Sequence, residues 1–535
     1  MDKRIVILAL VVAAGVLLFR AFVSGWGPPE VASGPVPYGI THNETDNLSY
    51  AAWAQQAKRG LATFSDLYTT TDHDPLLFNL LFLFVGGIAS LAAVSPVHVL
   101  NVLGLLAVPV FVFAIAGTCR VLKFGGATTL AVVAFALGGG GISWIRAILS
   151  KAGLGEVLAI GGLGAEFGYF DLYPALAFFI YPYQSVSLAV LAVLVFLIVR
   201  YDRGLTVSGA VLLLGVSGLL AAIRPYEPIA VLVAYGGAVL MTWRQPGALL
   251  VRRGGILGCL FVGILPFTAY ALWVRSQPVW DHFAGGSLAI VGADWAAGFF
   301  VLWVLAAAGA VILGRRLLRS PFLFPSVWAL QCGILLLILN SGYTKLVGGV
   351  TVALAMLAGA CIERIPVKPG KVRAAVITGI MVLALASSLV KINSFARTEN
   401  RLTLPAEYFD AVNAIKDAST VLTDCGTGVA LPGLGGFRVY CGHWALTDGF
   451  DEKNALLSAL GFGGHTGAFE RNTVAALLGQ IEAQRFDVVL LRADAGLLRS
   501  LQPIAAECLI HKNKAYTAMR LCPQIRDAIS ERASR

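Results

Sequence analysis

The chain has 535 residues, of which 57% are hydrophobic and 13% are charged, and its mean hydropathy is +0.78. A soluble globular protein carries roughly 25% charged residues, so this composition excludes that class and indicates an integral membrane protein. The formal net charge is +10. Its basic residues lie in short clusters between apolar runs, which is typical of cytoplasmic loops and does not indicate binding to nucleic acid.

The chain begins with two basic residues, Lys3 and Arg4, followed by an apolar run to about Phe22. The run shows no small-residue cleavage site, so we interpret it as an uncleaved first span with its N-terminus inside. The later basic clusters predict about 11 spans in total, with the N-terminus in the cytoplasm and the C-terminus outside. The predicted spans are residues 4–23, 97–118, 125–142, 180–199, 205–223, 226–243, 255–273, 296–314, 322–340, 346–361 and 374–391.

One further apolar stretch, residues 76–94, does not fit this alternation. If it crossed the bilayer, Arg120 and Lys123 would lie outside and every later basic cluster would be inverted. We therefore interpret it as a juxtamembrane or re-entrant helix on the outer surface. The alternative is that it spans, and that another crossing lies within 143–179.

The first outer loop, residues 24–95, is rich in carboxylates. From Asp46 onward, Asp46, Tyr50 and Trp53 recur at helical spacing, while Gln55, Gln56, Lys58 and Arg59 fall on the opposite face. This pattern predicts an amphipathic helix lying on the membrane surface. Asp46 near its N-terminus is either a helix cap or a carboxylate aimed into a cavity beside the bundle. A second acidic group follows at Asp72 and Asp74.

The C-terminal residues differ from the rest. We predict domain 1–393 as the transmembrane part and 394–535 as a small external α/β domain, with strands near 421–423, 437–440 and 486–491 and a helix at 473–484. Leu509 to Leu521 reads as a closing hairpin. The four C-terminal cysteines are either two disulfides, Cys425 with Cys441 and Cys508 with Cys522, or four buried thiols.

An uncleaved first span followed by Asp46, Tyr50 and Ala54, in the form Asp-x-x-x-Tyr-x-x-x-Ala, resembles the GT-C superfamily of membrane glycosyltransferases. This superfamily includes the protein O-mannosyltransferases and the lipid A aminoarabinose transferases. The run Asp72-His73-Asp74-Pro75-Leu76 resembles the superfamily's His-Pro-Pro-Leu segment, although His73-Asp74 replaces its His-Pro. The similarity covers about residues 1–120. Gly348-Gly349 with Lys345, and Gly442-His443-Trp444, look like features of bacterial members.

The resemblance implies an enzyme that moves a hexosyl or pentosyl sugar from a polyprenyl-phosphate donor to a cell-envelope acceptor. The acceptor, whether lipid, glycan or protein, stays open. Catalysis would take place at the outer face of the cytoplasmic membrane, with membrane lipids around it. The resemblance places the general base on Asp46, and Glu44 is the second choice.

The leaving phosphate needs cations at the outer surface. Arg224 and Lys345 are predicted there against the positive-inside trend, and Arg275 is a third candidate; lipid headgroup binding by snorkelling is the alternative role. Candidates for substrate binding are Tyr50, Asp72, His73, Asp74, Tyr181 and Tyr183. For the tyrosines, an interfacial aromatic belt explains the pattern equally well.

No cofactor is predicted, and no metal spacing of cysteines and histidines is present. A divalent cation remains open, held by Glu44, Asp46, Asp72 and Asp74 if they fold together. His282 could bind a metal with Asp281, but one such pair is too little for a metal site. Two functions compete with glycosyl transfer. One is a transporter or flippase of lipid-linked glycans, and the other is a GT-C-like scaffold that binds a glycan without catalysis.

Overall fold

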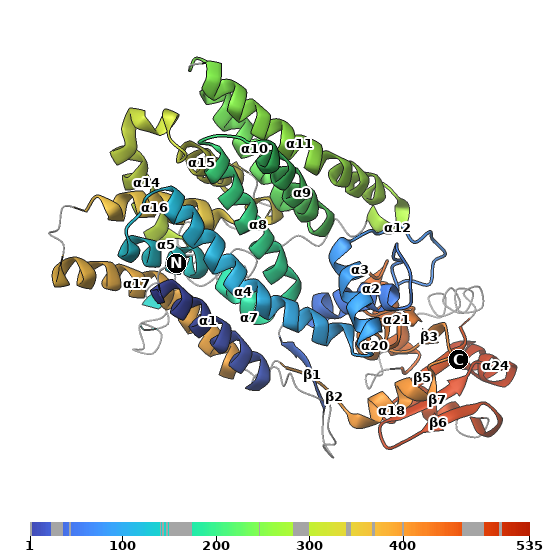
Figure 1. Ribbon diagram of the computed structural model, residues 1–535. Coiled ribbons are helices and arrows are strands. Elements are labelled where there is room, and N and C mark those ends of the chain that lie inside the picture. The colour runs from blue at the N-terminus through green and yellow to red at the C-terminus, as the bar shows by residue number, and fades with distance from the viewer. Residues whose placement is uncertain are drawn as a thin grey trace. The chain divides into compact units, whose positions relative to one another are not determined.

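The computed structural model describes residues 3–22, 36–41, 44–139, 141, 144–145, 148, 174–245, 247–281, 299–338, 344–365, 370–397, 401–462, 486–501 and 505–534. By contacts, the chain divides into two compact units, and many of their elements are labelled in Figure 1. We call Met1–Val23, Leu100–Leu272 and Ser287–Asn400 the helical unit. Ser24–Val99, Trp273–Gly286 and Arg401–Arg535 form the mixed unit. Residues 401–535 are thus grouped with the first outer loop, whereas the sequence-based division at 393/394 sets them apart.

The described part of the helical unit is built from apolar helices. They are α1 (Lys3–Phe22), most of α4 (Pro96–Val121), α5 (Gly126–Gly138), α7 (Pro174–Ile180), α8 (Pro182–Tyr201), α9 (Val207–Ile223), α10 (Tyr226–Met241), most of α11 (Gly247–Arg275), α14 (Phe300–Leu313), α15 (Leu323–Ile338), α16 (Val350–Glu363) and α17 (Lys371–Arg397). Short 3-10 turns η4 (Gly314–Arg319) and η5 (Thr344–Val347) precede α15 and α16.

Each predicted span overlaps one of these helices. Among the described residues, five helices are long and apolar enough to cross a membrane: Lys3–Phe22, Pro96–Val121, Pro182–Tyr201, Gly247–Arg275 and Phe300–Arg319. The other predicted spans coincide with shorter apolar helices or with α17. The chain is therefore a multi-pass membrane protein by length and composition. The total of 11 spans and the side on which each terminus lies remain predictions.

Small residues allow close helix contacts in the helical unit. A Cβ on Gly309 of α14 would collide with the Leu357 carbonyl oxygen of α16. A Cβ on Gly359 of α16 would lie 2.5 Å from Val132 Cγ2 of α5. Because apolar side chains gain little by leaving lipid for protein, such close backbone approach is a main source of helix association in membranes. The centre of this unit therefore depends on van der Waals packing around α16.

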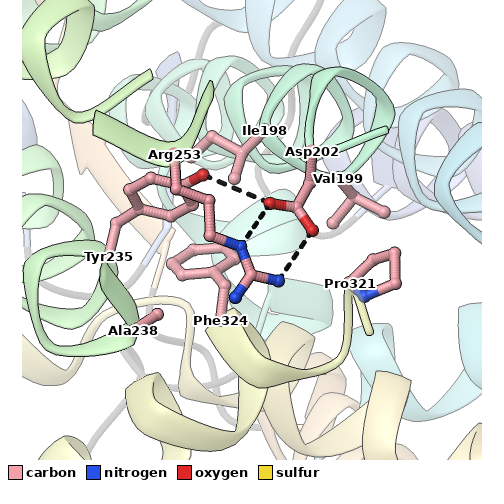
Figure 2. Close-up of a pocket in the computed structure, with 8 residues that line it drawn as sticks. All are labelled: Ile198, Val199, Asp202, Tyr235, Ala238, Arg253, Pro321 and Phe324. Carbon is pink, nitrogen blue, oxygen red and sulfur yellow. Dashed lines mark hydrogen bonds and ion pairs between the residues drawn. The ribbon is translucent and has the colours of Figure 1, made fainter. Parts of the chain in front are cut away.

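A buried ion pair connects α10 and α11 of the same unit to Asp202, which directly follows α8 (Figure 2). Arg253 of α11 donates from Nε to Asp202 Oδ1 at 2.8 Å and from Nη2 to Asp202 Oδ2 at 3.0 Å. Its remaining described bonds go to the carbonyls of Leu318 and Ser320, and the Tyr235 hydroxyl of α10 donates to Asp202 Oδ1. Both charged side chains are at most 7% exposed. Every carboxylate oxygen is bonded, so this pair serves the fold.

The described part of the mixed unit contains two sheets and several short helices. Its helices are α2 (Glu44–Lys58), α3 (Leu80–Leu91), α12 (Pro278–Asp281), α18 (Ala406–Ala414), α19 (Cys425–Gly428), α20 (Leu431–Gly435), α21 (Phe450–Ala459), α23 (Gly496–Leu501), the 3-10 turn η6 (Ala505–Glu507) and α24 (Pro523–Ser534). Strand β1 (Val36–Thr41) pairs antiparallel with β2 (Arg401–Leu404), with Val36 opposite Leu404. This pairing joins the first loop to the C-terminal residues.

The larger sheet has the order β4-β3-β5-β7-β6. Strands β3, β5, β6 and β7 are labelled in Figure 1. Its strands are β3 (Thr420–Leu422), β4 (Arg438–Val439), β5 (Val488–Arg492), β6 (Leu509–Lys512) and β7 (Tyr516–Arg520). Strand β3 is parallel to both β4 and β5, and β7 is antiparallel to β5 and β6. The predicted strands and hairpin lie at these places, whereas the helix predicted at 473–484 falls outside the described residues.

Two disulfides lie in the mixed unit, and they join the pairs that the predicted strand ends suggested. Cys425 is bonded to Cys441, across 16 residues, and Cys508 to Cys522, across 14 residues. The first links α19 to the residue that follows Tyr440 after β4. The second closes the β6–β7 hairpin.

The first-loop helices differ from the surface helices that the sequence predicted. Helix α2 is buried on most of its circumference, including Gln56 on its expected polar face. Gln56 exchanges two hydrogen bonds with the Ser65 backbone, and a Cβ on Gly86 of α3 would press into α2 at Ala54 and Ala57. The polar face predicted for α2 is thus partly enclosed, because the Ser65 backbone bonds Gln56 and the Val94 carbonyl accepts from Lys58. Helix α3 has 12 residues, or about 18 Å, which is short of a bilayer core and favours the non-spanning interpretation of residues 76–94.

Candidate active site

Asp46 lies in the first turn of α2, and Glu44 is the first residue of that helix. Because Asp46 is the third helical residue, it does not occupy the N-cap position. Its side chain is 35% exposed, and Oδ1 lies 3.2 Å from Nε2 of His443. Glu44 is exposed. Of the two carboxylates, Asp46 is therefore the one that a described side chain orients.

His443 reaches Asp46 from the far end of the chain. It follows β4 by four residues and comes two residues after Cys441, which is held to Cys425 by the disulfide. Between them, Gly442 packs so closely that a Cβ would lie 2.8 Å from Tyr68 Cδ1 and 3.1 Å from the Gly428 carbonyl oxygen. A larger residue at 442 would displace the histidine, so this glycine is required for the contact.

A tight turn follows the histidine and fixes its backbone. The amides of Leu446 and Thr447 donate to the His443 carbonyl at 3.2 and 2.8 Å, and the Thr447 hydroxyl accepts from the Gly442 amide at 3.1 Å. The Ala445 amide donates to Nδ1 of the ring at 3.0 Å. The ring itself is buried, with its side chain 4% exposed. The imidazole is therefore held at both its nitrogens.

The second acidic group of the loop, Asp72 and Asp74, is more exposed than Asp46. Asp72 is fully exposed and lies 3.3 Å from Nη1 of Arg438. Nε2 of His73 accepts from the Asp66 amide at 3.0 Å, while Nδ1 bonds to the Thr71 carbonyl at 2.8 Å. Asp74 is exposed. His73 thus braces its own loop, and both its nitrogens are engaged by backbone groups.

Two charged residues were missed by the sequence analysis. Asp66 is fully buried, and its Oδ1 accepts from the Tyr68 amide at 2.8 Å. Burial lowers the pKa of Lys453 below its usual value, while Asp448 and Asp66 act in the opposite direction. The Lys453 ammonium lies 4.8 Å from the ring centre of Tyr440, whose pKa burial raises to about 12. Neither Asp66 nor Lys453 sits in a recognisable motif, so spacing alone could not have found them.

The three cations proposed for the donor phosphate lie in different settings. In the helical unit, Arg224 is 11% exposed at its side chain and pairs with Glu227 at 2.8 Å. Lys345 is in η5, but its side chain lies outside the described residues. In the mixed unit, Arg275 ends α11 and is exposed. Since Glu227 already compensates Arg224, its charge is less available to a phosphate than a solvent-facing cation would be.

The candidate tyrosines are mostly packing residues. Tyr181 and Tyr183 are buried in the helical unit, and the Tyr183 hydroxyl donates to the Ile223 carbonyl at 2.6 Å. Tyr50 stacks on Phe82 of α3, with ring centres 5.9 Å apart, and adjoins Trp53. The interfacial belt considered from the sequence does not describe Tyr181 and Tyr183, because both are enclosed by protein.

No metal site is formed by the residues that the structure describes, since they contain no group of three or more His, Cys, Asp or Glu side chains able to hold an ion. The oxygen-rich arrangement of Glu44, Asp46, Asp72 and Asp74 is therefore not present. His282, the partner considered for Asp281, lies outside the described residues.

No protein-family model matches the chain, and no curated protein matches it. Solved structures do match. ArnT from Cupriavidus metallidurans bound to undecaprenyl phosphate has a TM-score of 0.53 at 12% identity, covering 98% of this chain and 99% of that one. Apo ArnT from the same organism has a TM-score of 0.49 at 13% identity, covering 96% and 98%. The arabinofuranosyltransferase AftD from Mycobacteria has a TM-score of 0.49 at 16% identity, covering 92% of this chain and 37% of that chain.

The comparison with lipid-bound ArnT extends over nearly the whole length of both chains. At 12% identity it is a likeness of fold, independent of the loop motifs on which the sequence analysis relied. The architecture implied by those motifs is confirmed to this extent: over nearly its whole length, this multi-pass chain is similar in fold to lipid-bound ArnT.

Proposed function

We propose that this protein transfers a sugar from a polyprenyl-phosphate-linked donor to a cell-envelope acceptor, with Asp46 as general base. The observation that carries the proposal is the Asp46 carboxylate, held by His443 yet 35% exposed, in a chain with the ArnT fold. A carboxylate that is oriented and still reachable has the geometry required of a base. The ArnT structure contains undecaprenyl phosphate, which supports the class of donor.

The reaction needs little from the protein beyond this group. The acceptor hydroxyl attacks the anomeric carbon, forming a new C–O bond while the bond to the lipid phosphate breaks. The hydroxyl proton passes to the Asp46 carboxylate, and the electron pair leaves with the phosphate. General base catalysis of this kind contributes roughly 10²- to 10⁴-fold to the rate.

The departing phosphate gains negative charge, and cations stabilise it. Arg275 and Lys345 are the stronger candidates, because Arg224 is paired with Glu227. We place the reaction on the outer face of the cytoplasmic membrane, following the charge pattern of the loops. The disulfides Cys425–Cys441 and Cys508–Cys522 support an oxidising compartment for the mixed unit.

The test uses the full chain in lipid nanodiscs, supplied with undecaprenyl-phosphate-linked hexoses and pentoses and with extracts of envelope lipids, glycans and proteins. Release of undecaprenyl phosphate is followed by mass spectrometry. We expect turnover with one donor class, and a loss of about 10²- to 10⁴-fold in Asp46→Asn. The variant should retain the melting temperature of the parent, because the oxygen of the introduced amide can still accept the hydrogen bond from His443.

Two further variants sharpen the result. Glu44→Gln tests the second choice of base and should retain turnover. Asp527→Asn removes an exposed carboxylate on α24 of the same unit and serves as the matched control. Full activity in folded Asp46→Asn would remove Asp46 as the base. Absence of turnover with every donor, together with retained binding of undecaprenyl phosphate, would instead favour the non-catalytic scaffold.

A further inference from the structure

Resting on the proposed function, the geometry points to His443 as a positioning residue for Asp46. We infer that it acts as a neutral hydrogen-bond donor fixed in one tautomer, and that it does not carry the reaction's proton. The inference depends on the contacts at its two ring nitrogens, one to Asp46 and one to the Ala445 backbone.

The hydrogen-bond pattern assigns the tautomer. A backbone amide can only donate, so Nδ1 must accept from Ala445 with its lone pair. The single proton of the neutral ring then resides on Nε2. From there it is donated to Oδ1 of Asp46 at 3.2 Å. The imidazole thus holds the carboxylate in one orientation without adding a charge beside it.

The same pattern excludes a relay through the ring. In a Ser-His-Asp triad, the histidine takes a proton on one nitrogen while the other already bears a proton donated to the aspartate. Here a second proton would have to sit on Nδ1, directly facing the Ala445 N–H. The proton removed from the acceptor therefore ends on Asp46, and His443 keeps the proton with which it began.

The surroundings prevent the ring from turning. Its neighbours are Trp444, stacked with ring centres 6.0 Å apart, and Tyr68 at 5.6 Å. Tyr68 is itself held by a hydrogen bond from its hydroxyl to the Val429 carbonyl at 3.1 Å. Val429 directly follows α19, which carries Cys425 of the disulfide to Cys441. The disulfide and the packing of the neighbouring rings therefore together hold Nε2 of His443 in its donor position.

Two near-isosteric substitutions separate positioning from proton transfer. The side-chain amide of His443→Gln can place an N–H near the position of Nε2, whereas that of His443→Asn ends near Nδ1 and cannot reach Asp46. We expect the Asn variant to lose roughly 10- to 100-fold in kcat, the scale of one hydrogen bond to a charged group. The Gln variant should stay within a few-fold of the parent, and KM for the lipid donor should not change in either.

The activities of the Gln and Asn variants decide whether His443 positions Asp46 or transfers a proton. Equal, large losses of kcat in folded Gln and Asn variants would overturn the inference, since they would require the imidazole's own proton chemistry. Full activity in the Asn variant would also overturn it. If the Asn variant does not fold, a folded Gln variant with less than a tenth of parental kcat overturns it, and one within a few-fold supports it. Asp46→Asn is measured in parallel. Unimpaired turnover in that variant would show that Asp46 is not the base, and the proposed function would then fail together with the role of His443.

Discussion

Two carboxylates, Asp202 in the helical unit and Asp46 in the mixed unit, differ in their exposure to solvent and in their hydrogen-bond partners. Asp202 in the helical unit is 7% exposed at its side chain, and Arg253 and Tyr235 occupy both its oxygens (Figure 2). Asp46 in the mixed unit is bonded by the neutral donor His443 and remains 35% exposed. Asp202 has a full cationic partner and is largely withdrawn from solvent, while Asp46 is oriented on one side and accessible on another.

This difference distinguishes a carboxylate that stabilises the fold from one that is available to a substrate. A desolvated ion pair costs free energy that only near-complete hydrogen bonding offsets, so Asp202 has no capacity left for a substrate. An accessible carboxylate with a fixed donor keeps its capacity to accept a proton. The two carboxylates, Asp202 and Asp46, both have a hydrogen-bond partner, and they differ in the exposure of their side chains.

The largest expected effect on folding comes from breaking the buried pair. Asp202→Asn leaves the Arg253 guanidinium without its counter-charge and should destabilise the protein by about 3–5 kcal/mol. Asp46→Asn should leave the melting temperature within error of the parent. Thermal unfolding of both variants in the same detergent makes the comparison. The double variant Asp202→Asn, Arg253→Met should recover much of the loss, and equal stability of Asp202→Asn and parent would refute the structural role.

The next largest effects on stability are expected from the two disulfides, which can be compared directly. They close loops of similar length, 16 and 14 residues, so each should contribute about 3 kcal/mol to stability. Only Cys425–Cys441 adjoins His443. Replacing Cys425 and Cys441 by serine should therefore lower kcat as well as stability, whereas the Cys508→Ser, Cys522→Ser protein should lose stability alone. Equal kcat in the two variants, measured well below their melting temperatures, would disconnect the first disulfide from the site.

A smaller effect concerns pH and Lys453. Burial lowers its pKa in the folded state, so the unfolded chain binds more protons as pH rises through that value toward 10.5. The Lys453 contribution to stability should therefore increase as pH rises toward 10.5. Below 10, Tyr440 adds little, since its pKa is raised to about 12. Lys453→Met should flatten this rise in denaturation midpoints, and an unchanged slope would contradict the assignment.

The smallest change is expected at Asp72. Because its side chain is fully exposed beside Arg438, solvent screens the pair, and Asp72→Asn should leave the melting temperature unchanged. A rise in the acceptor's KM in this variant would restore Asp72 as a substrate-binding residue. An unchanged KM would leave it as a surface carboxylate and sharpen the contrast with Asp46.

Much of the architecture could be predicted from local pattern. Long apolar runs located the helices, and short runs such as residues 486–491 located strands of the larger sheet, because both patterns are carried by neighbours in the chain. Cys508 and Cys522 flank a hairpin that the sequence already indicated, which made their disulfide one of two alternatives, and the structure contains that disulfide. The first-loop motif also singled out Asp46 before any partner was known.

The sequence by itself determined the membrane class, the helical segments and the aspartate on which the proposed chemistry depends. Only the tertiary structure decided that α2 is enclosed, that Arg224 is paired with Glu227, and that His443, 397 residues from Asp46, supplies its donor. The physical reason is that hydrophobic periodicity is set by adjacent residues. The partner of a polar group, in contrast, is chosen when distant segments pack and one of many available donors becomes the one within reach.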